Sequence, residues 1–333
     1  MSWTHHLAER IRRNEPLPPL IGPILSAATP LVRFGMWQRL RAPRTRLDAH
    51  VISYGNITAG GTGKTPAVIE RVQHELAAGK RVAVLTRGYG SESNTEPVVI
   101  KPEGDVHDLV RTIGDEPALI ATKAPGVVIA KGADRIAAAR MAIESFECDT
   151  LILDDGYQYV KLEREENVLV IDATNPMGNG HLLPRGILRE DVEAVSRATS
   201  IILTRCDQAE NLDALNEELN VLNPNAPVRH TTHAPVQFRR LQDDAPMPLI
   251  NLRGKNVIAA CGIGNPDAFE TTLTTLGLTI KESHAFADHQ AIGPQVLNNP
   301  LPVIVTDKDA VRIQDPSKNI FALEIALCDW PQS

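Results

Sequence analysis

Short apolar runs alternate with helix-like patterns through the first two thirds of the chain. The apolar runs lie at 50–57, 81–86, 126–130, 150–155, 167–173 and 200–205. Apolar residues recur at helical spacing in the intervening stretches 66–78, 133–146 and 209–222. Such alternation predicts an α/β fold, in which a parallel sheet is covered by helices on both faces.

The first predicted helix has recognisable ends. Pro66 suits the first helical position, because its missing N–H would have no partner there. Val68, Val72 and Leu76 then recur at helical spacing, and Gly79 is placed to end the helix.

The pattern changes towards the C-terminus. Residues 174–199 hold several glycines and little periodicity, which is typical of a functional loop inside an α/β domain. The stretch NPNAP ends the last helix-like pattern, and short β-like runs and further strand–helix units follow it. The sequence therefore predicts three parts: an N-terminal segment 1–46, a large α/β domain 47–225 and a smaller C-terminal α/β domain 226–333.

The N-terminal segment has an unusual composition. Residues 16–32 carry no charge, but four prolines and a glycine fall within 16–23. The stretch is also short for a transmembrane helix, which needs about 20 apolar residues. It is followed by five arginines: Arg33, Arg39, Arg41, Arg44 and Arg46. Two interpretations are open: a buried helix, or an amphipathic segment on a membrane surface with its arginines near anionic headgroups.

Charge and cysteine content narrow the class of protein. The formal net charge is −7, which argues against nucleic acid as a partner. The four cysteines lie far apart and lack metal-ligand spacing, which is typical of a protein in a reducing cytosol. We find no sign of an obligate protein partner.

A glycine-rich loop, NITAGGTGKTP at 56–66, follows the first apolar run. It matches the phosphate-binding pattern G-x-x-x-x-G-K-[ST], except that Thr58 stands at the first glycine. Glycines let backbone N–H groups turn towards phosphate oxygens, and the following helix adds its positive end. The sequence predicts a P-loop NTPase-type domain that binds ATP through Thr58, Gly60, Gly61, Thr62, Gly63, Lys64 and Thr65.

Two aspartates end another predicted strand, in LILDDGYQ at 151–158. Open α/β sheets bind ligands at the carboxyl ends of their strands, where Asp154 and Asp155 would lie. Together with the Thr65 hydroxyl they could hold the Mg²⁺ that bridges nucleotide phosphates. The alternative is a pair of ordinary surface aspartates.

A kinase also needs a group that deprotonates its acceptor hydroxyl. The candidates are Asp115 and Glu116 in IGDEPAL, and we count Glu116 among the candidate metal ligands as well. His289, in FADHQ, could support the carboxylate. Asp115 could instead cap a helix that begins at Pro117.

Seven motifs occur along the chain in a fixed order: GNITAGGTGKTP, TRGYG, GDEP, LDDGYQ, LLPRGILRE, FADH and TDKDAVR. Together they resemble the tetraacyldisaccharide 4′-kinases, the lipid A 4′-kinases of Gram-negative bacteria. The resemblance runs from the N-terminal apolar segment to about residue 312. In that family the loop resembles N-x-T-x-G-G-T-G-K-T-P, so Thr58 is the regular residue there.

The resemblance implies an activity and a place in the cell. The family transfers the γ-phosphate of ATP, with Mg²⁺, to the 4′-hydroxyl of a lipid disaccharide 1-phosphate. It works at the cytoplasmic face of the bacterial inner membrane as a peripheral enzyme. Its fold is a P-loop domain with a smaller domain and an N-terminal helix that meets the membrane, which favours the membrane-surface interpretation of residues 1–46.

The resemblance also implies roles for individual residues. Lys64 and Thr65 would hold phosphates and metal, with Asp154 and Asp155 serving the metal. Asp115 would accept the hydroxyl proton.

Several further residues take roles by the same resemblance. His289 would support Asp115. Arg189 would stabilise phosphate charge, with Arg185 a weaker candidate, and Tyr89 would lie near the nucleotide base. The sequence departs from the family at Gln290, where a second histidine is frequent, and at Arg185 in PRGILRE.

Two other classes of protein remain open. One is a P-loop kinase acting on a soluble metabolite, which would need neither lipid nor membrane. The other is a non-catalytic nucleotide switch. Partition-type ATPases carry an extra lysine before the two glycines, and Ala59 at that position counts against a switch.

Overall fold

The computed structural model describes residues 3–88, 96–287, 290–314 and 316–331. Backbone contacts divide the chain into two compact units, each built from separated segments. The first unit comprises Met1–Lys64, Thr150–Thr232 and Asp329–Ser333, and the second comprises Thr65–Asp149 and His233–Cys328. No helix in the described ranges is long and apolar enough to cross a membrane.

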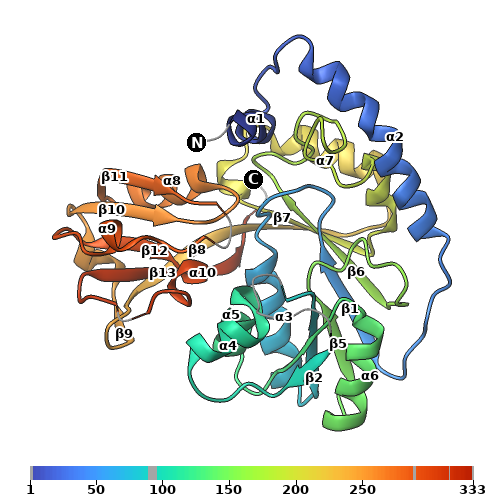
Figure 1. The fold of residues 1–333 in the computed structure, drawn as a ribbon, viewed down its shortest axis with the longest axis horizontal. Coiled ribbons are helices and arrows are strands. Elements are labelled where there is room, and N and C mark those ends of the chain that lie inside the picture. Colours follow the sequence, from blue (N-terminus) through green and yellow to red (C-terminus); the bar gives the residue numbers. More distant parts are fainter. Residues whose placement is uncertain (1–2, 89–95, 288–289, 315, 332–333) are drawn as a thin grey trace. The chain divides into compact units, whose positions relative to one another are not determined.

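The first unit is built on parallel strands in the order β8-β7-β6-β1-β5. The strands are β1 (His50–Gly55), β5 (Thr150–Leu153), β6 (Glu166–Asp172), β7 (Ser200–Thr204) and the start of β8 (Val228–Arg240). Its helical elements are α1 (Trp3–Arg12), α2 (Ile21–Leu40), η1 (Val192–Arg197), η2 (Cys206–Gln208) and α7 (Leu212–Leu222). Figure 1 shows α2 as a long helix in blue.

The core of this unit joins the sheet to the loops that follow it. Ile57 and Tyr157, which lie just after β1 and β5, pack with Leu169 of β6 and with Leu215 and Leu219 of α7. All of them are buried. The residues around the glycine-rich loop are therefore positioned by the same apolar burial that holds the sheet together.

The second unit contains a three-stranded group near its N-terminal end. β2 (Val82–Thr86) runs parallel to β4 (Val128–Lys131), and β3 (Val98–Ile100) pairs with β4 in the antiparallel direction. The helices of this segment are α3 (Lys64–Ala77), α4 (Val106–Ile113), α5 (Asp115–Lys123) and α6 (Arg135–Phe146).

The α3 helix buries Ala67, Val68 and Val72 on one face, as predicted. It begins at Lys64, two residues earlier than expected, so Pro66 lies within its first turn, where no N–H partner is lost. Gly79 takes the left-handed conformation, with φ of 79°, just after the helix ends.

The C-terminal segment of the second unit holds parallel strands in the order β11-β10-β12-β13. These are β10 (Asn256–Cys261), β11 (Thr279–Ala285), β12 (Val303–Thr306) and β13 (Ile320–Asp329), and β9 (Ala245–Met247) pairs antiparallel with the end of β8. The remaining elements are η3 (Leu249–Leu252), α8 (Pro266–Thr275), α9 (Pro294–Leu297) and α10 (Asp307–Ala310). Helix α8 packs on β10 and β11 (Figure 1).

Both faces of the central strand β10 are buried. Val257 and Ala259 of β10 belong to one apolar cluster, whereas their neighbours Ile258 and Ala260 belong to another. Alternate side chains of a strand point to opposite faces, so each cluster covers one face of the sheet. This is the arrangement expected of a parallel sheet between helices.

The predicted fold class is confirmed: the chain is an α/β protein with parallel strands flanked by helices. Residues 174–199 contain η1 as their one regular element, in agreement with the predicted loop. The β-like runs at 228–241 form the single strand β8. The elements β3, α4 and β11 were not predicted, although Val106, Leu109, Val110 and Ile113 of α4 recur at helical spacing. The domain limits at 46 and 225 stay a prediction.

We predict that Gly55→Ala destabilises the protein by about 1–3 kcal/mol, as overpacking does elsewhere. A Cβ atom at this position would lie 2.6 Å from both the Cβ and the backbone nitrogen of Tyr157, and neither atom can move freely. Gly35→Ala, in α2, is the matched control, because nothing lies within 4 Å of the Cβ atom that alanine would add there. Urea unfolding followed by circular dichroism measures both, and equal stabilities would contradict the prediction.

Candidate active site

The loop after β1 is organised by the side chain of Asn56, which is fully buried. Its amide nitrogen donates a hydrogen bond to the backbone oxygen of Thr58 at 2.7 Å, and its amide oxygen accepts one from Lys64 Nζ at 3.1 Å. Gly60 and Gly63 have φ values of 116° and 80°, which side-chain-bearing residues rarely adopt. The buried side-chain amide of Asn56 therefore links the start of the loop to Lys64 at its end.

Residues 187–189 of the long loop run beside the glycine-rich loop. The backbone nitrogen of Ala59 donates to the oxygen of Ile187, and that of Arg189 donates to the oxygen of Ile57, each at 2.6 Å. The hydroxyl of Thr204, at the end of β7, donates to the backbone oxygen of Thr62 at 2.8 Å. The glycine-rich loop is thus held from two directions, as a preorganised anion site requires.

The two aspartates after β5 have different surroundings. Asp154 is 4% exposed, whereas Asp155 is half-buried with φ of 52°, a left-handed conformation that is uncommon for a residue other than glycine. Asp155 Oδ1 lies 3.5 Å from Lys64 Nζ, and Arg189 Nη1 donates to both Asp155 oxygens at 3.0 and 2.8 Å. The structure therefore brings together three predicted site residues from three separate motifs.

A second set of contacts supports this cluster. Gln158 Nε2 donates to the backbone oxygen of Asn56 and to Glu190 Oε1, both at 2.8 Å. Arg197 Nη2 donates to Glu190 Oε2 at 2.7 Å. Burial raises the pKa of Tyr157, whose hydroxyl donates to the backbone oxygen of Ala194 at 2.7 Å. The sequence analysis assigned no role to Asn56, Gln158 or Glu190, although all three lie within the quoted motifs.

The predicted base lies in the second unit, at the start of α5. Asp115 is 3% exposed, and its Oδ1 accepts a hydrogen bond from the backbone nitrogen of Glu116 at 2.9 Å. Asp115 Oδ2 lies 3.5 Å from Arg312 Nη1, and Glu116 Oε1 lies 2.7 Å from Lys308 Nζ. The residue that precedes the helix is Gly114, so Asp115 is the first helical residue rather than the N-cap.

The structure says less about the remaining residues that the sequence singled out. Tyr89 and His289 lie outside the described residues, so their roles stay predictions. Thr65 is the second residue of α3. Arg185 Nη1 donates to Ser26 Oγ of α2 at 2.9 Å, and Gln290 Oε1 accepts from the backbone nitrogen of Ala287 at 3.2 Å.

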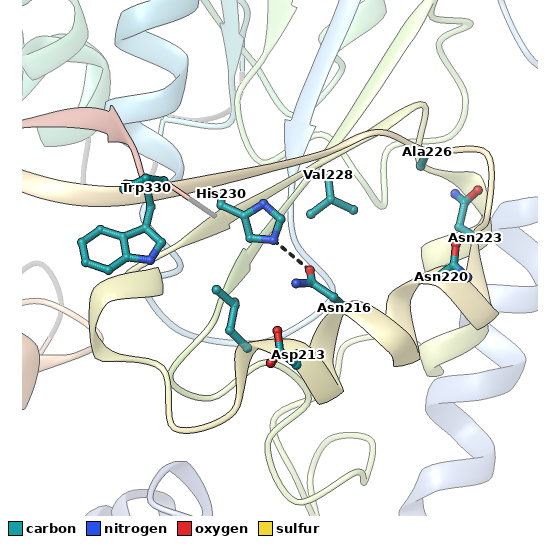
Figure 2. Close-up of a pocket in the computed structure, with 10 residues that line it drawn as sticks. Asp213, Asn216, Asn220, Asn223, Ala226, Val228, His230 and Trp330 are labelled. Atoms are coloured by element: carbon teal, nitrogen blue, oxygen red, sulfur yellow. Dashed lines mark hydrogen bonds between the residues drawn. The ribbon is translucent and has the colours of Figure 1, made fainter. Parts of the chain in front are cut away.

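A polar pocket of about 720 Å³ lies elsewhere in the first unit, between α7, the start of β8 and the C-terminal residues Trp330 and Pro331 (Figure 2). His230 Nε2 lies 2.8 Å from Asn216 Oδ1 at this pocket, and burial lowers the pKa of His230. None of the predicted site residues lines it. Within the described ranges, no group of three or more His, Cys, Asp or Glu side chains could hold a metal ion alone.

A glycine-rich loop between a strand and a helix, with a lysine beside an acidic strand end, defines a nucleotide-binding protein of the P-loop class. The model of the family described as tetraacyldisaccharide-1-P 4′-kinase matches residues 22–330. The chain belongs to this family. The predicted family is thereby confirmed, and so is the prediction of a kinase.

Relatives of known name agree with this assignment. The tetraacyldisaccharide 4′-kinase of Anaeromyxobacter dehalogenans is 38% identical over 92% of this chain and 84% of its own length. That of Geobacter sulfurreducens is 36% identical over 88% of this chain and 85% of its own length. The crystal structure of LpxK from Aquifex aeolicus in complex with ATP has a TM-score of 0.72 and 26% identity, and covers 92% of this chain and 93% of that one.

We predict that Lys64→Ala lowers phosphoryl transfer by far more than tenfold while the protein stays folded. Lys64 is placed beside the loop, where its charge would stabilise the transferring phosphate. Steady-state transfer assays measure the effect, with circular dichroism as the folding check. Lys80→Ala, an exposed lysine just beyond α3, is the control and should keep normal activity. A loss within about tenfold, or ~1.4 kcal/mol of barrier, would contradict the role of Lys64.

Proposed function

We propose that this chain transfers the γ-phosphate of ATP to the 4′-hydroxyl of a tetraacyldisaccharide 1-phosphate, with the cluster of Lys64, Asp155 and Arg189 at the phosphates. The observation that carries the proposal is this cluster, in which two cations converge on the end of β5 beside a glycine-rich loop. Phosphoryl transfer is accelerated mainly by positioning and by charge stabilisation, and the cluster offers both.

The glycine-rich loop has the features that a bound triphosphate needs. The hydroxyl oxygen of Thr62 is buried and has no hydrogen-bond partner among the described residues. Buried polar atoms are nearly always paired, so a phosphate oxygen is a fitting partner for this hydroxyl. Gly60 and Gly63 leave the backbone free to turn its N–H groups towards the same ligand.

Magnesium fits the carboxylates at the end of β5. Mg²⁺ is commonly held by one or two carboxylates together with nucleotide phosphates, so a cage made of protein alone is not required. Asp154 and Asp155 are the proposed ligands, and the roles of Thr65 and Glu116 at the metal stay predictions. Phosphate oxygens would compete with Asp155 for Lys64 and Arg189, which would leave its carboxylate available to the metal. Bound Mg²⁺ would neutralise charge on the β- and γ-phosphates.

We assign the role of general base to Asp115, with His289 as its predicted support. The Asp115 carboxylate is buried, and its Oδ1 accepts the N–H of Glu116 at the start of α5. An ionised carboxylate of this kind can accept the proton of the acceptor hydroxyl if the substrate places that hydroxyl beside it.

We predict that Asp115→Asn lowers the transfer rate by about 10²–10⁴, the range that general base catalysis contributes. An amide retains the hydrogen bond to the Glu116 N–H but cannot accept the hydroxyl proton. The measurement is transfer from labelled ATP to lipid disaccharide 1-phosphate in mixed micelles, at saturating ATP and lipid.

The control is Asp105→Asn, which changes the N-cap of α4, whose carboxylate accepts the His107 N–H, and should leave the rate unchanged. Near-normal turnover of Asp115→Asn would mean that Asp115 only supports the helix start. The same assay separates the alternatives: ATP hydrolysis without phosphorylated lipid would indicate a nucleotide switch, and transfer only to a water-soluble acceptor would indicate a metabolite kinase.

We also propose that α2 attaches the protein to the surface of the bacterial inner membrane, on its cytoplasmic face. Leu31, Phe34 and Trp37 of α2 are 75, 56 and 48% exposed, although a helix normally turns such residues inward. Leu25, Val32 and Met36 of the same helix are half-buried. Two polar contacts also join α2 to other parts of the first unit: Ser26 Oγ accepts from Arg185, and the exposed Arg33 pairs with Asp191 at 2.7 Å.

Two exposed apolar residues of α2 lie on the side opposite Ser26 and Arg33. Ser26 and Arg33 lie seven residues apart, and so do Ile24 and Leu31, two positions earlier. Two positions are about 200° around a helix, so the two pairs occupy opposite faces. A helix that leaves large apolar side chains exposed suits the boundary between headgroups and acyl chains.

We predict that Leu31→Asp with Phe34→Asp reduces binding to vesicles of phosphatidylethanolamine and phosphatidylglycerol. Charged side chains would have to enter the apolar layer, and the cost grows with burial. Vesicle flotation measures the bound fraction. Val221→Asp, which alters another exposed apolar residue of the first unit (83% exposed), is the control and should bind normally. Unchanged flotation of the double variant would exclude α2 as the attachment site.

A further inference from the structure

Each acidic residue of the GDEP motif forms an ion pair with a basic residue of the TDKDAVR stretch at 306–312. Arg312 Nη1 lies 3.5 Å from Asp115 Oδ2, and Lys308 Nζ lies 2.7 Å from Glu116 Oε1. The two acidic residues are neighbours in the chain, and the two cations are four positions apart. Because α5 and α10 pack against each other, both pairs form across one helix contact.

Arg312 is itself held in place by a fully buried carboxylate. Asp309 contacts Arg312 Nη2, and it accepts hydrogen bonds from the backbone nitrogen of Gly262 at 3.0 Å and from Thr306 Oγ1 at 2.6 Å. Asp309 is 1% exposed, so these contacts are shielded from water. A Cβ atom at Gly262 would come within 3.0 Å of Asp309 Oδ1 and 3.4 Å of Arg312 Nη2, so the backbone approaches the pair closely.

The other terminal nitrogen of the same guanidinium is directed at Asp115. Arg312 Nη1 is buried and makes no hydrogen bond among the described residues, although it forms the ion pair with Asp115. A buried donor without a hydrogen bond is unfavourable, and a guanidinium kept in this state is held by its other contacts. Contacts of catalytic groups are often long before the substrate binds and shorten afterwards.

We propose that Arg312 is the positioning residue of Asp115: Asp309 fixes one side of its guanidinium, and the other side orients the Asp115 carboxylate. The proposal rests on the assignment of Asp115 as the base. It gives the TDKDAVR motif a role in catalysis through a residue that need not touch the substrate. Lys308 would hold the neighbouring Glu116 in the same way.

The elements packed against α5 carry charged residues of their own. The adjacent α4 carries Asp108 and Arg111, which pair with each other at the surface. The adjacent strand β4 ends in Lys131, whose Nζ donates to the backbone oxygen of Thr112 at 2.7 Å. The ion pair on which the proposal depends is the one between Arg312 Nη1 and Asp115 Oδ2, at 3.5 Å.

The far end of α5 provides a matched control. Lys123 Nζ lies 2.6 Å from Glu324 Oε1 and 3.2 Å from Asp307 Oδ2. Lys123 thus links α5 to the α10 segment as Arg312 does, but without contacting Asp115. The α3 helix also meets this end, where Gln73 Nε2 donates to the backbone oxygen of Lys123 at 2.7 Å.

The first measurement compares Arg312→Met, Arg312→Lys and Lys123→Met in the full-length protein with the lipid disaccharide 1-phosphate. We expect Arg312→Met to lower kcat by about 10–100-fold, less than loss of the base itself, with little change in the KM for ATP. Arg312→Lys keeps a positive charge at this position and should restore most of kcat, and Lys123→Met should change neither kcat nor the KM for ATP.

The second measurement is a double-mutant cycle between Arg312→Met and Asp115→Asn. If Arg312 acts through Asp115, the double variant should be no slower than Asp115→Asn alone. Thermal unfolding of each variant separates a loss of fold from a loss of rate. If Arg312→Met does not fold, Asp309→Asn, which releases the guanidinium but keeps both partners, takes its place in the cycle.

The outcomes distinguish this proposal from the one on which it rests. A slow Asp115→Asn with a normal Arg312→Met would overturn the role of Arg312 and leave Asp115 as the base. Additive losses in the cycle, or a lower kcat that Arg312→Lys does not restore, would show that Arg312 is structural or acts independently, and would also overturn the proposal. A fully active Asp115→Asn would overturn both assignments.

Discussion

The carboxylate of Asp155 joins three segments of the first unit that are far apart in the sequence. It meets Lys64 from the glycine-rich loop and Arg189 from the long loop, while its own position is set by the end of β5. Without a shared anion, two positive charges would stand close together with nothing to offset their repulsion. The backbone at Asp155 takes a left-handed conformation, with φ of 52°. A strained backbone conformation persists where many surrounding contacts hold the residue in place. Such conformations are frequent at functional sites.

Ion pairs also hold acidic side chains in place in the second unit. The acidic residues of the GDEP motif are paired with cations of the TDKDAVR motif, and Asp309 in turn anchors Arg312. Burying ion pairs gains little stability, because the desolvation of both charges opposes their attraction. A chain of buried charges is therefore better explained by the need to present one carboxylate in a defined orientation than by the need for a stable fold.

The α2 helix leaves several large apolar side chains exposed. Most helices of a globular protein bury their apolar face and turn their polar face to water. Here Leu31 and Phe34 are exposed, while Ser26 and Arg33 make polar contacts with other parts of the first unit. The sequence analysis gave Arg185 as a weaker candidate for stabilising phosphate charge. In the structure it donates a hydrogen bond to Ser26 of this helix. The residue connects the helix to the loop that also carries Arg189.

Much of the site could be predicted from the sequence because its key residues are local to their motifs. The order of glycines, Lys64 and Thr65 is a property of one loop between a strand and a helix, and Asp154 and Asp155 follow their strand directly. Asn56, Gln158 and Glu190 were quoted in motifs but received no role, because a buried amide looks the same in sequence as an exposed one. Only the fold shows that Gln158 bridges Asn56 and Glu190.

The sequence by itself determined the alternation of strands and helices, the parallel character of the sheet, the phosphate loop and the family. These follow from patterns within a few consecutive residues, where backbone geometry sets the spacing. The tertiary structure alone decided which charges meet: Asp155 with Lys64 and Arg189, and Asp115 with Arg312 across nearly two hundred residues. It also decided which face of α2 is exposed. The reason is physical: the path of the chain in space decides which side chains meet and which are buried. The spacing of residues along the sequence does not reveal that path.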